Sequence, residues 1–213
     1  MQVLLVEALL SGLFRNVNSS ILSEGLAMAS SLIRDLSNAG YNVSTVVCRD
    51  FLKLSRFLKP STVRKISGVS FPELRKLARL YDLTYIIAPE DDWLLAHILE
   101  ELDGFHICSD HEAVRRVSDK SVTMSELSRI SLKTPKTLTY TPENPMDLGS
   151  LKPPFIVKPR TGTGCEGLKV FQSSAELKRF LLNKKREFLV QEFVKGIPAS
   201  VSLLTDGLEA LPI

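Results

Sequence analysis

The sequence predicts an α/β protein whose first part is an open, mostly parallel sheet with helices on both faces. Four short apolar runs have the uninterrupted hydrophobicity of strands that are buried on both sides. They lie at residues 2–6, 43–48, 83–88 and 105–108. Segments with helical periodicity separate these runs, and that alternation is typical of parallel strands joined by helices. After Ser109 the strands become shorter and a glycine-rich loop appears, which indicates a second unit of α+β type.

Helices are expected between the strands of the first part. Apolar residues recur every three or four positions between Ser19 and Gly40, so a long helix is expected there, and glycine is a frequent helix terminator. A basic amphipathic helix should follow Cys48, with its arginine and lysine side chains in solvent. Two more helices are expected at residues 72–81 and 91–102.

The acidic group Glu90–Asp92 follows a predicted strand and opens the last of these helices. Carboxylates at this place complement the helix N-terminus, and acid–base chemistry is the alternative interpretation. Ligands of open α/β sheets bind beyond the carboxyl ends of the strands, so Glu90 is also a candidate substrate contact.

The second unit is expected to mix helices with shorter strands. The predicted helices lie at 111–117, 120–130 and 174–182, and the predicted strands at 155–158, 168–171 and 188–193. Two further strands, at 199–204 and 208–213, are expected to form a hairpin that turns at Asp206–Gly207, a strong turn dipeptide.

Composition excludes several classes of protein. The formal net charge is only +3, and acidic and basic residues are mixed along the chain, so neither nucleic acid nor a membrane is expected as a partner. The three cysteines, Cys48, Cys108 and Cys165, show no metal-site or disulfide spacing, which indicates a reducing compartment. The N-terminus has no basic region before its apolar run, and no run approaches the ~20 residues of a membrane span. We therefore expect a cytoplasmic protein.

A strand that ends in a lysine is followed by a glycine loop. Lys158 precedes Gly162, Gly164 and Gly167, and glycines let backbone N–H groups approach a polyanion closely. A P-loop and a dinucleotide-binding turn both lead into a helix, whereas this loop leads into a predicted strand. The pattern predicts a phosphate site, with an ordinary β-hairpin turn and a solvated lysine as the alternative.

Three segments in this order resemble the ATP-grasp superfamily. They are Ser118-Asp119-Lys120, the segment that contains Lys158-Pro159 and the glycine loop, and Gln191-Glu192-Phe193-Val194-Lys195-Gly196. In that superfamily a "DK" helix, a "KP…GxGxxG" hairpin and an "E-aromatic-aliphatic-x-G" hinge build the nucleotide site. The resemblance implies a pre-ATP-grasp α/β domain at 1–109, a small nucleotide-binding subdomain at 110–193 and the start of a second subdomain at 194–213.

The resemblance also implies a role for each matching residue. Lys120 and Lys158 would hold the α- and β-phosphate region of ATP. The glycine loop would close over the phosphates as a lid, and its matching residues are Thr161, Gly162, Thr163, Gly164, Cys165 and Gly167. The hinge would read the adenine edge, and its residues are Gln191, Glu192, Phe193 and Val194. Pro198 stands where many members carry a ribose-binding glutamate, so ribose recognition departs from the pattern.

The implied reaction joins a small-molecule carboxylate to an amine. The carboxylate would attack the γ-phosphate of ATP, and an amine would displace phosphate from the resulting acyl phosphate. Mg²⁺ is the implied metal, but only Asp206 and Glu209 are acidic after the hinge. No metal ligand is therefore assigned within the chain, the ligands are expected beyond Ile213, and the chain alone is expected to be inactive.

Short segments resemble the tyramine–L-glutamate ligase branch of the superfamily. They are Ser23–Met28, Ala88–Asp91 and Gly164–Gly167, and they imply glutamate as the acid and a γ-glutamyl amide as the product. Three alternatives stay open: a ligase represented by a partial chain, a non-catalytic or split nucleotide-binding module, and an α/β interaction protein. The apolar final hairpin favours self-association, so a homo-oligomer is also expected.

Overall fold

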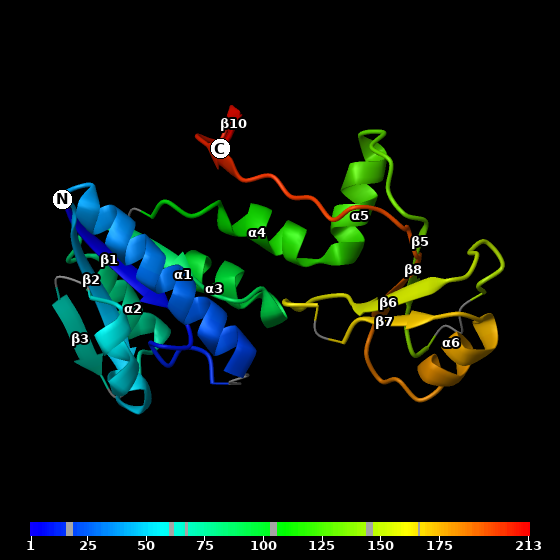
Figure 1. Cartoon of the computed structure of the whole chain (residues 1–213), viewed down its shortest axis with the longest axis horizontal. Coiled ribbons are helices and arrows are strands. Elements are labelled where there is room, and N and C mark those ends of the chain that lie inside the picture. The colour runs from blue at the N-terminus through cyan, green and yellow to red at the C-terminus, as the bar shows by residue number, and fades with distance from the viewer. Residues whose placement is uncertain (16–18, 60–61, 67, 103–105, 144–146, 166) are drawn as a thin grey trace.

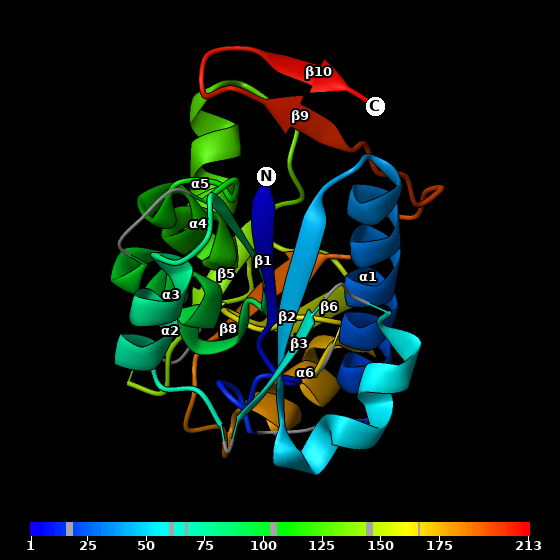
Figure 2. The ribbon, with the colours of Figure 1, turned by 90° about the vertical axis from the view of Figure 1, so that its left-hand side faces the viewer.

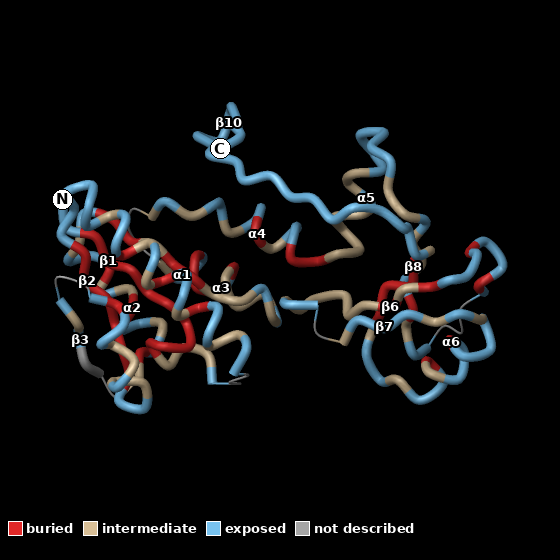
Figure 3. The backbone as a smooth tube through the Cα atoms, in the orientation of Figure 1, coloured by how far each residue is buried: buried red, intermediate tan, exposed pale blue. Residues whose placement is uncertain are grey.

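In its described part, the molecule contains two four-stranded sheets joined by two helices, and a separate two-stranded hairpin (Figure 1). The computed structural model describes residues 1–15, 19–59, 62–66, 68–102, 106–143, 147–165 and 167–213. The first sheet lies at the N-terminal end of the molecule and the second at the opposite end. Figure 3 shows that buried residues concentrate in these two ends. The α/β fold class is confirmed, with one parallel and one antiparallel sheet.

The first sheet is parallel throughout and has the order β3-β2-β1-β4. Its strands are β1 (Gln2–Glu7), β2 (Asn42–Cys48), β3 (Thr62–Ile66) and β4 (Leu83–Ile87). Every residue of β1 from Val3 onward is buried, because helices cover both faces of the sheet. The carboxyl ends of all four strands therefore meet at one edge, which faces the second sheet (Figure 1).

Helices cover the two faces of the first sheet, as the sequence predicts (Figure 2). On one face lie α1 (Ser19–Asn38) and the 3₁₀ helix η1 (Arg49–Phe57), whose apolar residues pack against Val3 and Leu5. On the other face lie α2 (Phe71–Ala78) and α3 (Leu94–Glu101), which pack against Leu4 and Val6. Alternate residues of β1 thus enter two different apolar cores.

Three predicted elements of the first part differ from the structure. The basic helix after Cys48 is the short 3₁₀ helix η1, and the chain then forms β3, which the sequence analysis missed. The predicted fourth strand at 105–108 is reduced, in its described part, to a single bridge between His106 and Thr84. The acidic segment 90–92 does not cap α3, because Asp92 and Trp93 adopt left-handed φ angles of 45° and 56° in the turn η2 (Asp91–Trp93) before it.

The second sheet is antiparallel and has the order β5-β8-β6-β7. Its strands are β5 (Thr137–Tyr140), β6 (Phe155–Pro159), β7 (Lys169–Phe171) and β8 (Phe188–Glu192). Helix α6 (Ser174–Leu181) covers one face, where Leu177 and Leu181 pack against Phe155, Val157 and Val190. Strand β5 was missed, because the segment before the proline-rich loop has few apolar residues.

Helices α4 (His111–Ser118) and α5 (Lys120–Arg129) connect the two sheets. The chain ends in the predicted hairpin of β9 (Leu203–Thr205) and β10 (Ala210–Pro212), with Gly207 at the turn. All residues of both strands are exposed. In the described part of the chain, no helix combines the length and the hydrophobicity that a bilayer span requires.

Candidate functional site

The face of the second sheet opposite α6 carries the lysine that the sequence singles out. Side chains alternate along β6, so Phe155 and Val157 enter the core under α6 while Lys158 projects from the other face. Strand register places Lys158 beside Leu189 of β8, and it places Ile156 beside Gln191. Lys158 is half-buried at the end of its strand, next to the start of the glycine loop.

Helix α5 brings the second predicted lysine to the same place. Asp119 is the N-cap residue of α5, and its carboxylate accepts hydrogen bonds from the Ser121 and Val122 amides at 2.9 and 3.3 Å. The next residue is Lys120, whose backbone N–H donates to the carbonyl of Arg160 at 3.1 Å. The first turn of α5 is thereby fixed to the end of β6.

The ammonium group of Lys120 contacts the glycine loop. Its Nζ donates a hydrogen bond of 2.7 Å to the carbonyl oxygen of Gly162. Burial lowers the pKa of Lys120, and nearby carboxylates, Glu90 foremost, act in the opposite direction. Burial also lowers the pKa of Lys158, and the positive charge of Lys120 lowers it further. Two half-buried cations therefore stand within each other's electrostatic reach, an arrangement that a bound polyanion would stabilise.

The glycine loop contains positive φ angles, which residues with a side chain adopt only at an energetic cost. Gly162 and Gly167 have φ angles of 117° and 73°. A Cβ at Gly167 would lie 3.0 Å from Cγ of Pro159, so this position also lacks room for a side chain. Cys165 is exposed and has a φ of 58°. The loop is thus shaped by its glycines, and the thiol of Cys165 lies at its surface.

The hinge residues are held by hydrogen bonds to neighbouring segments. The buried side chain of Gln191 donates from Nε2 to Oγ1 of Thr137 at 2.7 Å. The amides of Glu192 and Phe193 donate to the carbonyls of Lys136 and Pro154, at 3.3 and 2.8 Å. These two amides are therefore already engaged. The amide of Val194 has no hydrogen bond within the described residues, so it is the hinge N–H that a ligand could use.

The loop after β4 approaches the glycine loop from the first sheet (Figure 1). A Cβ at Gly162 would lie 4.0 Å from Oδ1 of Asp91. Glu90 and Asp91 both contribute to the electrostatic environment of Lys120. The structure thus brings Glu90, predicted as a substrate contact, within electrostatic reach of Lys120.

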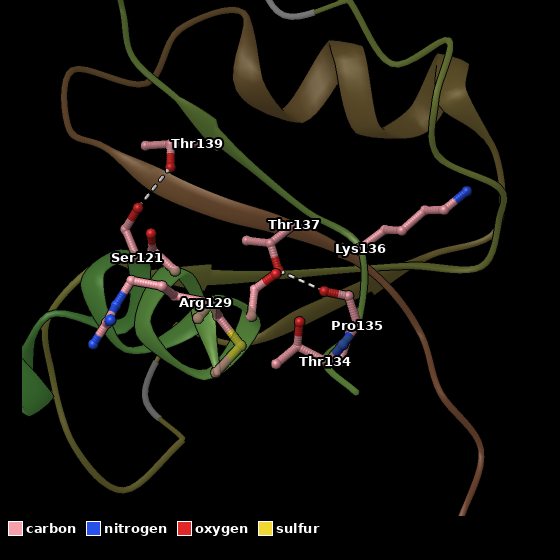
Figure 4. A pocket seen from close by; sticks show the side chains of 10 residues that line it. Ser121, Arg129, Thr134, Pro135, Lys136, Thr137 and Thr139 are labelled. Atoms are coloured by element: carbon pink, nitrogen blue, oxygen red, sulfur yellow. Dashed lines mark hydrogen bonds between the residues drawn. The ribbon is translucent and has the colours of Figure 1, made fainter. Parts of the chain in front are cut away.

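Two cavities lie outside this arrangement. The larger, of about 720 Å³, separates α5 from β5 and has a hydroxyl-rich lining (Figure 4). Oγ of Ser121 and Oγ1 of Thr139 lie 3.1 Å apart at one end of it, whereas Lys136 and Arg129 point away from each other. The smaller, of about 370 Å³, lies beyond β2 between Arg15 and Asp50. Neither cavity is lined by Lys120 or Lys158.

Two residues beside the lysines, Asp119 and Arg160, have no role in the predictions from sequence. Arg160 forms ion pairs with Asp119, at 2.7 Å, and with Glu187, at 2.5 Å. Asp119 lies in the "DK" segment and Arg160 directly follows Lys158-Pro159. This closeness to the two lysines is the one feature of the sequence that could have indicated a role for them. Within the described residues, no group of three or more His, Cys, Asp or Glu side chains could hold a metal ion.

Comparison with known proteins agrees with this geometry. Residues 117–213 match the family model described as the ATP-grasp domain. This part, slightly less than half of the chain, is similar to ATP-grasp domains. The D-alanine–D-alanine ligase of Aquifex aeolicus is 32% identical over 127 residues, which are 58% of this chain and 43% of that protein. The corresponding enzyme of Petrotoga mobilis is 31% identical over 128 residues, 58% of this chain and 42% of that protein. The chain thus spans less than half the length of those relatives.

Solved structures share the fold of this chain at low sequence identity. The VanG D-Ala:D-Ser ligase of Enterococcus faecalis superposes with a TM-score of 0.69 at 15% identity, covering 99% of this chain and 67% of that one. The N5-carboxyaminoimidazole synthetase of Staphylococcus aureus, complexed with ADP, gives 0.65 at 13% identity, over 94% of this chain and 48% of that one. An L-amino acid ligase of Bacillus licheniformis gives 0.63 at 14%, over 100% of this chain and 49% of that one.

Proposed function

We propose that the chain provides the nucleotide-phosphate site of an ATP-dependent ligase, which joins a carboxylate to an amine through an acyl phosphate. One observation carries the proposal: Lys120 and Lys158, from two elements, converge beside the glycine loop while both are half-buried. Neither lysine forms a direct ion pair within the described residues, and phosphate groups would supply charge-assisted hydrogen bonds to both.

Each part of the site has a task in this reaction. The two lysines hold the phosphates, and the Val194 amide is available to the adenine edge. The acyl phosphate must be kept from water, and the glycine loop covers the site for that purpose. Glu90, on the loop after β4, faces this region from the first sheet and is positioned to contact the amine or acid substrate.

Magnesium is the metal that this reaction class would use to neutralise the transferring phosphate. The described residues do not assemble a set of ligands for it. Asp206 accepts hydrogen bonds from the Leu208 and Glu209 amides in the final hairpin, so its carboxylate is engaged in the turn. No step is therefore assigned to a metal on these residues.

Glutamate and tyramine are the substrate pair that we propose for the first assays. The support is the likeness of Ser23–Met28, Ala88–Asp91 and Gly164–Gly167 to the tyramine–L-glutamate ligase branch. Sustained ADP release with this pair would support catalysis by the chain. Nucleotide binding without ADP release would support the alternative, a nucleotide-binding module that needs a separate polypeptide for activity.

Calorimetric titration with ADP tests the proposed phosphate site. Replacing Lys158 by alanine should weaken binding roughly tenfold or more, because a charge-assisted hydrogen bond contributes about 1.5–3 kcal/mol. Lys169→Ala is the matched control: this lysine lies on β7, on the face of the same sheet that α6 covers, with Nζ 5.0 Å from the Phe180 ring centroid. Equal ADP affinities of the wild type and Lys158→Ala would overturn the assignment.

A further inference from the structure

Three basic side chains gather at the end of β6, but their surroundings differ. Lys120 and Lys158 form no ion pair within the described residues. Arg160 is paired twice: its Nε and Nη2 donate to Oδ2 of Asp119 at 2.8 and 2.7 Å, and its Nη1 donates to Oε2 of Glu187. The guanidinium charge is thus balanced by two carboxylates, and this third cation adds little to the repulsion between the lysines.

Asp119 links Arg160 to the helix that carries Lys120. Its two carboxylate oxygens have different partners: Oδ1 accepts hydrogen bonds from the first amides of α5, and Oδ2 accepts both bonds from Arg160. A second connection runs through the backbone, where the amide of Lys120 donates to the Arg160 carbonyl. Arg160 therefore contacts the residue before Lys120 with its side chain and Lys120 itself with its main chain.

In the ion pair between Arg160 and Asp119, the aspartate is the partner that is shielded from solvent. The Asp119 side chain is only 8% exposed, and that of Arg160 is 36% exposed. Burial opposes ionisation of Asp119, but the hydrogen bonds from Arg160 and the α5 amides outweigh it and lower its pKa. Asp119 is therefore ionised at neutral pH and available to hold the guanidinium in one orientation.

We propose that Arg160 is a positioning residue, which holds Lys120 beside Lys158 through Asp119 and does not itself bind phosphate. The inference rests on the proposed function, because it concerns the placement of the two phosphate-binding lysines. We call the bonds between Arg160 and Asp119 the clamp. Without the clamp, the first turn of α5 loses its side-chain anchor to β6, and the two repelling ammonium groups move apart.

A double-mutant cycle on ADP affinity distinguishes positioning from direct contact. Arg160→Gln and Asp119→Asn should each weaken ADP binding about three- to tenfold, and asparagine retains an oxygen for capping α5. If Arg160 acts through Asp119, the ADP affinity of the double variant should equal that of the single variant with the lower affinity. Additive losses would overturn the proposal, because a direct phosphate contact would be lost independently of Asp119.

The pKa values of the two lysines give a second readout, which a merely structural role would not move. In Arg160→Gln, Lys120 should move towards solvent, so its lowered pKa should rise, and that of Lys158 should rise with it. Side-chain NMR of the lysine amines measures both values. Unchanged lysine pKa values in a folded Arg160→Gln variant would contradict the clamp.

Controls separate this inference from the proposed function and from loss of folding. Glu187→Gln leaves the bond between Arg160 and Asp119 in place, so its ADP affinity should stay within about twofold of the wild type. If Arg160→Gln does not fold, Arg160→Lys preserves one charged donor to Asp119 and should give an intermediate affinity. If Lys120→Ala and Lys158→Ala weaken ADP binding while Arg160→Gln and Arg160→Lys do not, only the clamp fails. If the lysine variants have no effect, the phosphate site itself fails.

Discussion

The buried carboxylate of Glu7 lies against Gly25 of α1, next to the first sheet. Glu7 ends β1 with 1% of its surface exposed, and its Oε2 accepts a hydrogen bond of 2.7 Å from the Leu10 amide. A Cβ at Gly25 of α1 would lie 2.6 Å from Oε1 of Glu7. The helix can pass this close to the strand end only because Gly25 has no side chain. Glu7 thus fixes the loop that follows β1 and the place of α1 together.

The stability of the protein should depend on pH through Glu7. Burial raises the pKa of Glu7 above its ordinary value of 4.5, although the Leu10 and Leu9 amides lower it. An acid with a raised pKa in the folded state binds its proton more tightly when folded, so stability falls as pH rises from below 4.5 through the folded-state value. Glu7→Gln removes this loss, and its free energy of unfolding should exceed that of the wild type more at about pH 7 than at about pH 4.

Urea denaturation at both pH values measures the difference. Glu24→Gln, on an exposed position of α1, is the matched control and should behave like the wild type at each pH. A free-energy difference between Glu7→Gln and the wild type that does not change with pH would contradict a raised pKa.

Cys165 gives a residue-scale probe of the glycine loop. It is exposed, whereas Cys48 is 4% exposed and Cys108 lies partly buried behind β4. Iodoacetamide should therefore modify Cys165 first, and ADP should slow that reaction because the loop would close over the bound phosphates. Mass spectrometry of the alkylated peptides checks both expectations. An alkylation rate at Cys165 that is unaffected by saturating ADP would separate the loop from the nucleotide site.

The sequence indicates Lys120 and Lys158 but not what holds them. Each lysine stands in a short local pattern, so it can be found without knowledge of the fold. Asp119 and Arg160 are 41 positions apart, and only the folded chain shows that they pair. Likewise, the pairing of the Glu192 and Phe193 amides with other segments could not be read from the hinge motif.

At the scale of elements, the two strands that the sequence analysis missed are both edge strands. Strand β3 ends the first sheet and β5 ends the second. An edge strand can keep polar and charged residues in place of an apolar run, as these two do, whereas the buried edge strand β4 is apolar and was predicted. In β3 these are Arg64 and Lys65, which suggested a basic helix, and in β5 they are Thr137 and Thr139. The central strands β1, β6 and β8 were found because burial requires apolar residues.

Besides its pairing with β8, strand β5 has a buried side-chain hydrogen bond to α6, which can be tested. The hydroxyl of Tyr140 is buried and donates to the Leu181 carbonyl at the end of α6, at 2.8 Å. Tyr140→Phe should lower the free energy of unfolding by about 0.5–1.5 kcal/mol, because the carbonyl loses its donor while the ring packing is kept. Tyr41→Phe, at a more exposed ring, should change it by less than about 0.5 kcal/mol. Equal stabilities of Tyr140→Phe and the wild type would show that β5 is not held in this way.

At the scale of the whole molecule, the candidate site depends on both sheets. Lys158 and the glycine loop belong to the second sheet, Glu90 and Asp91 follow β4 of the first, and α5 carries Lys120 between them. The fold class and most buried elements could be predicted from periodicity. The approach of Asp91 to Gly162 could not, because 71 positions separate them and no local pattern encodes their contact. The domain limits at residues 109 and 193 remain predictions.

The most direct test of the phosphate site is the pKa of each lysine in the free protein and with ADP. Side-chain NMR of the lysine amines resolves Lys120, Lys158 and the control Lys169 in one titration. Free protein should show lowered pKa values at Lys120 and Lys158, because both are half-buried and Lys120 repels Lys158. Bound phosphates favour the charged ammonium forms, so ADP should raise both values and leave Lys169 unchanged. Values at Lys120 and Lys158 that do not move while ADP is bound would contradict a phosphate site built on these two residues.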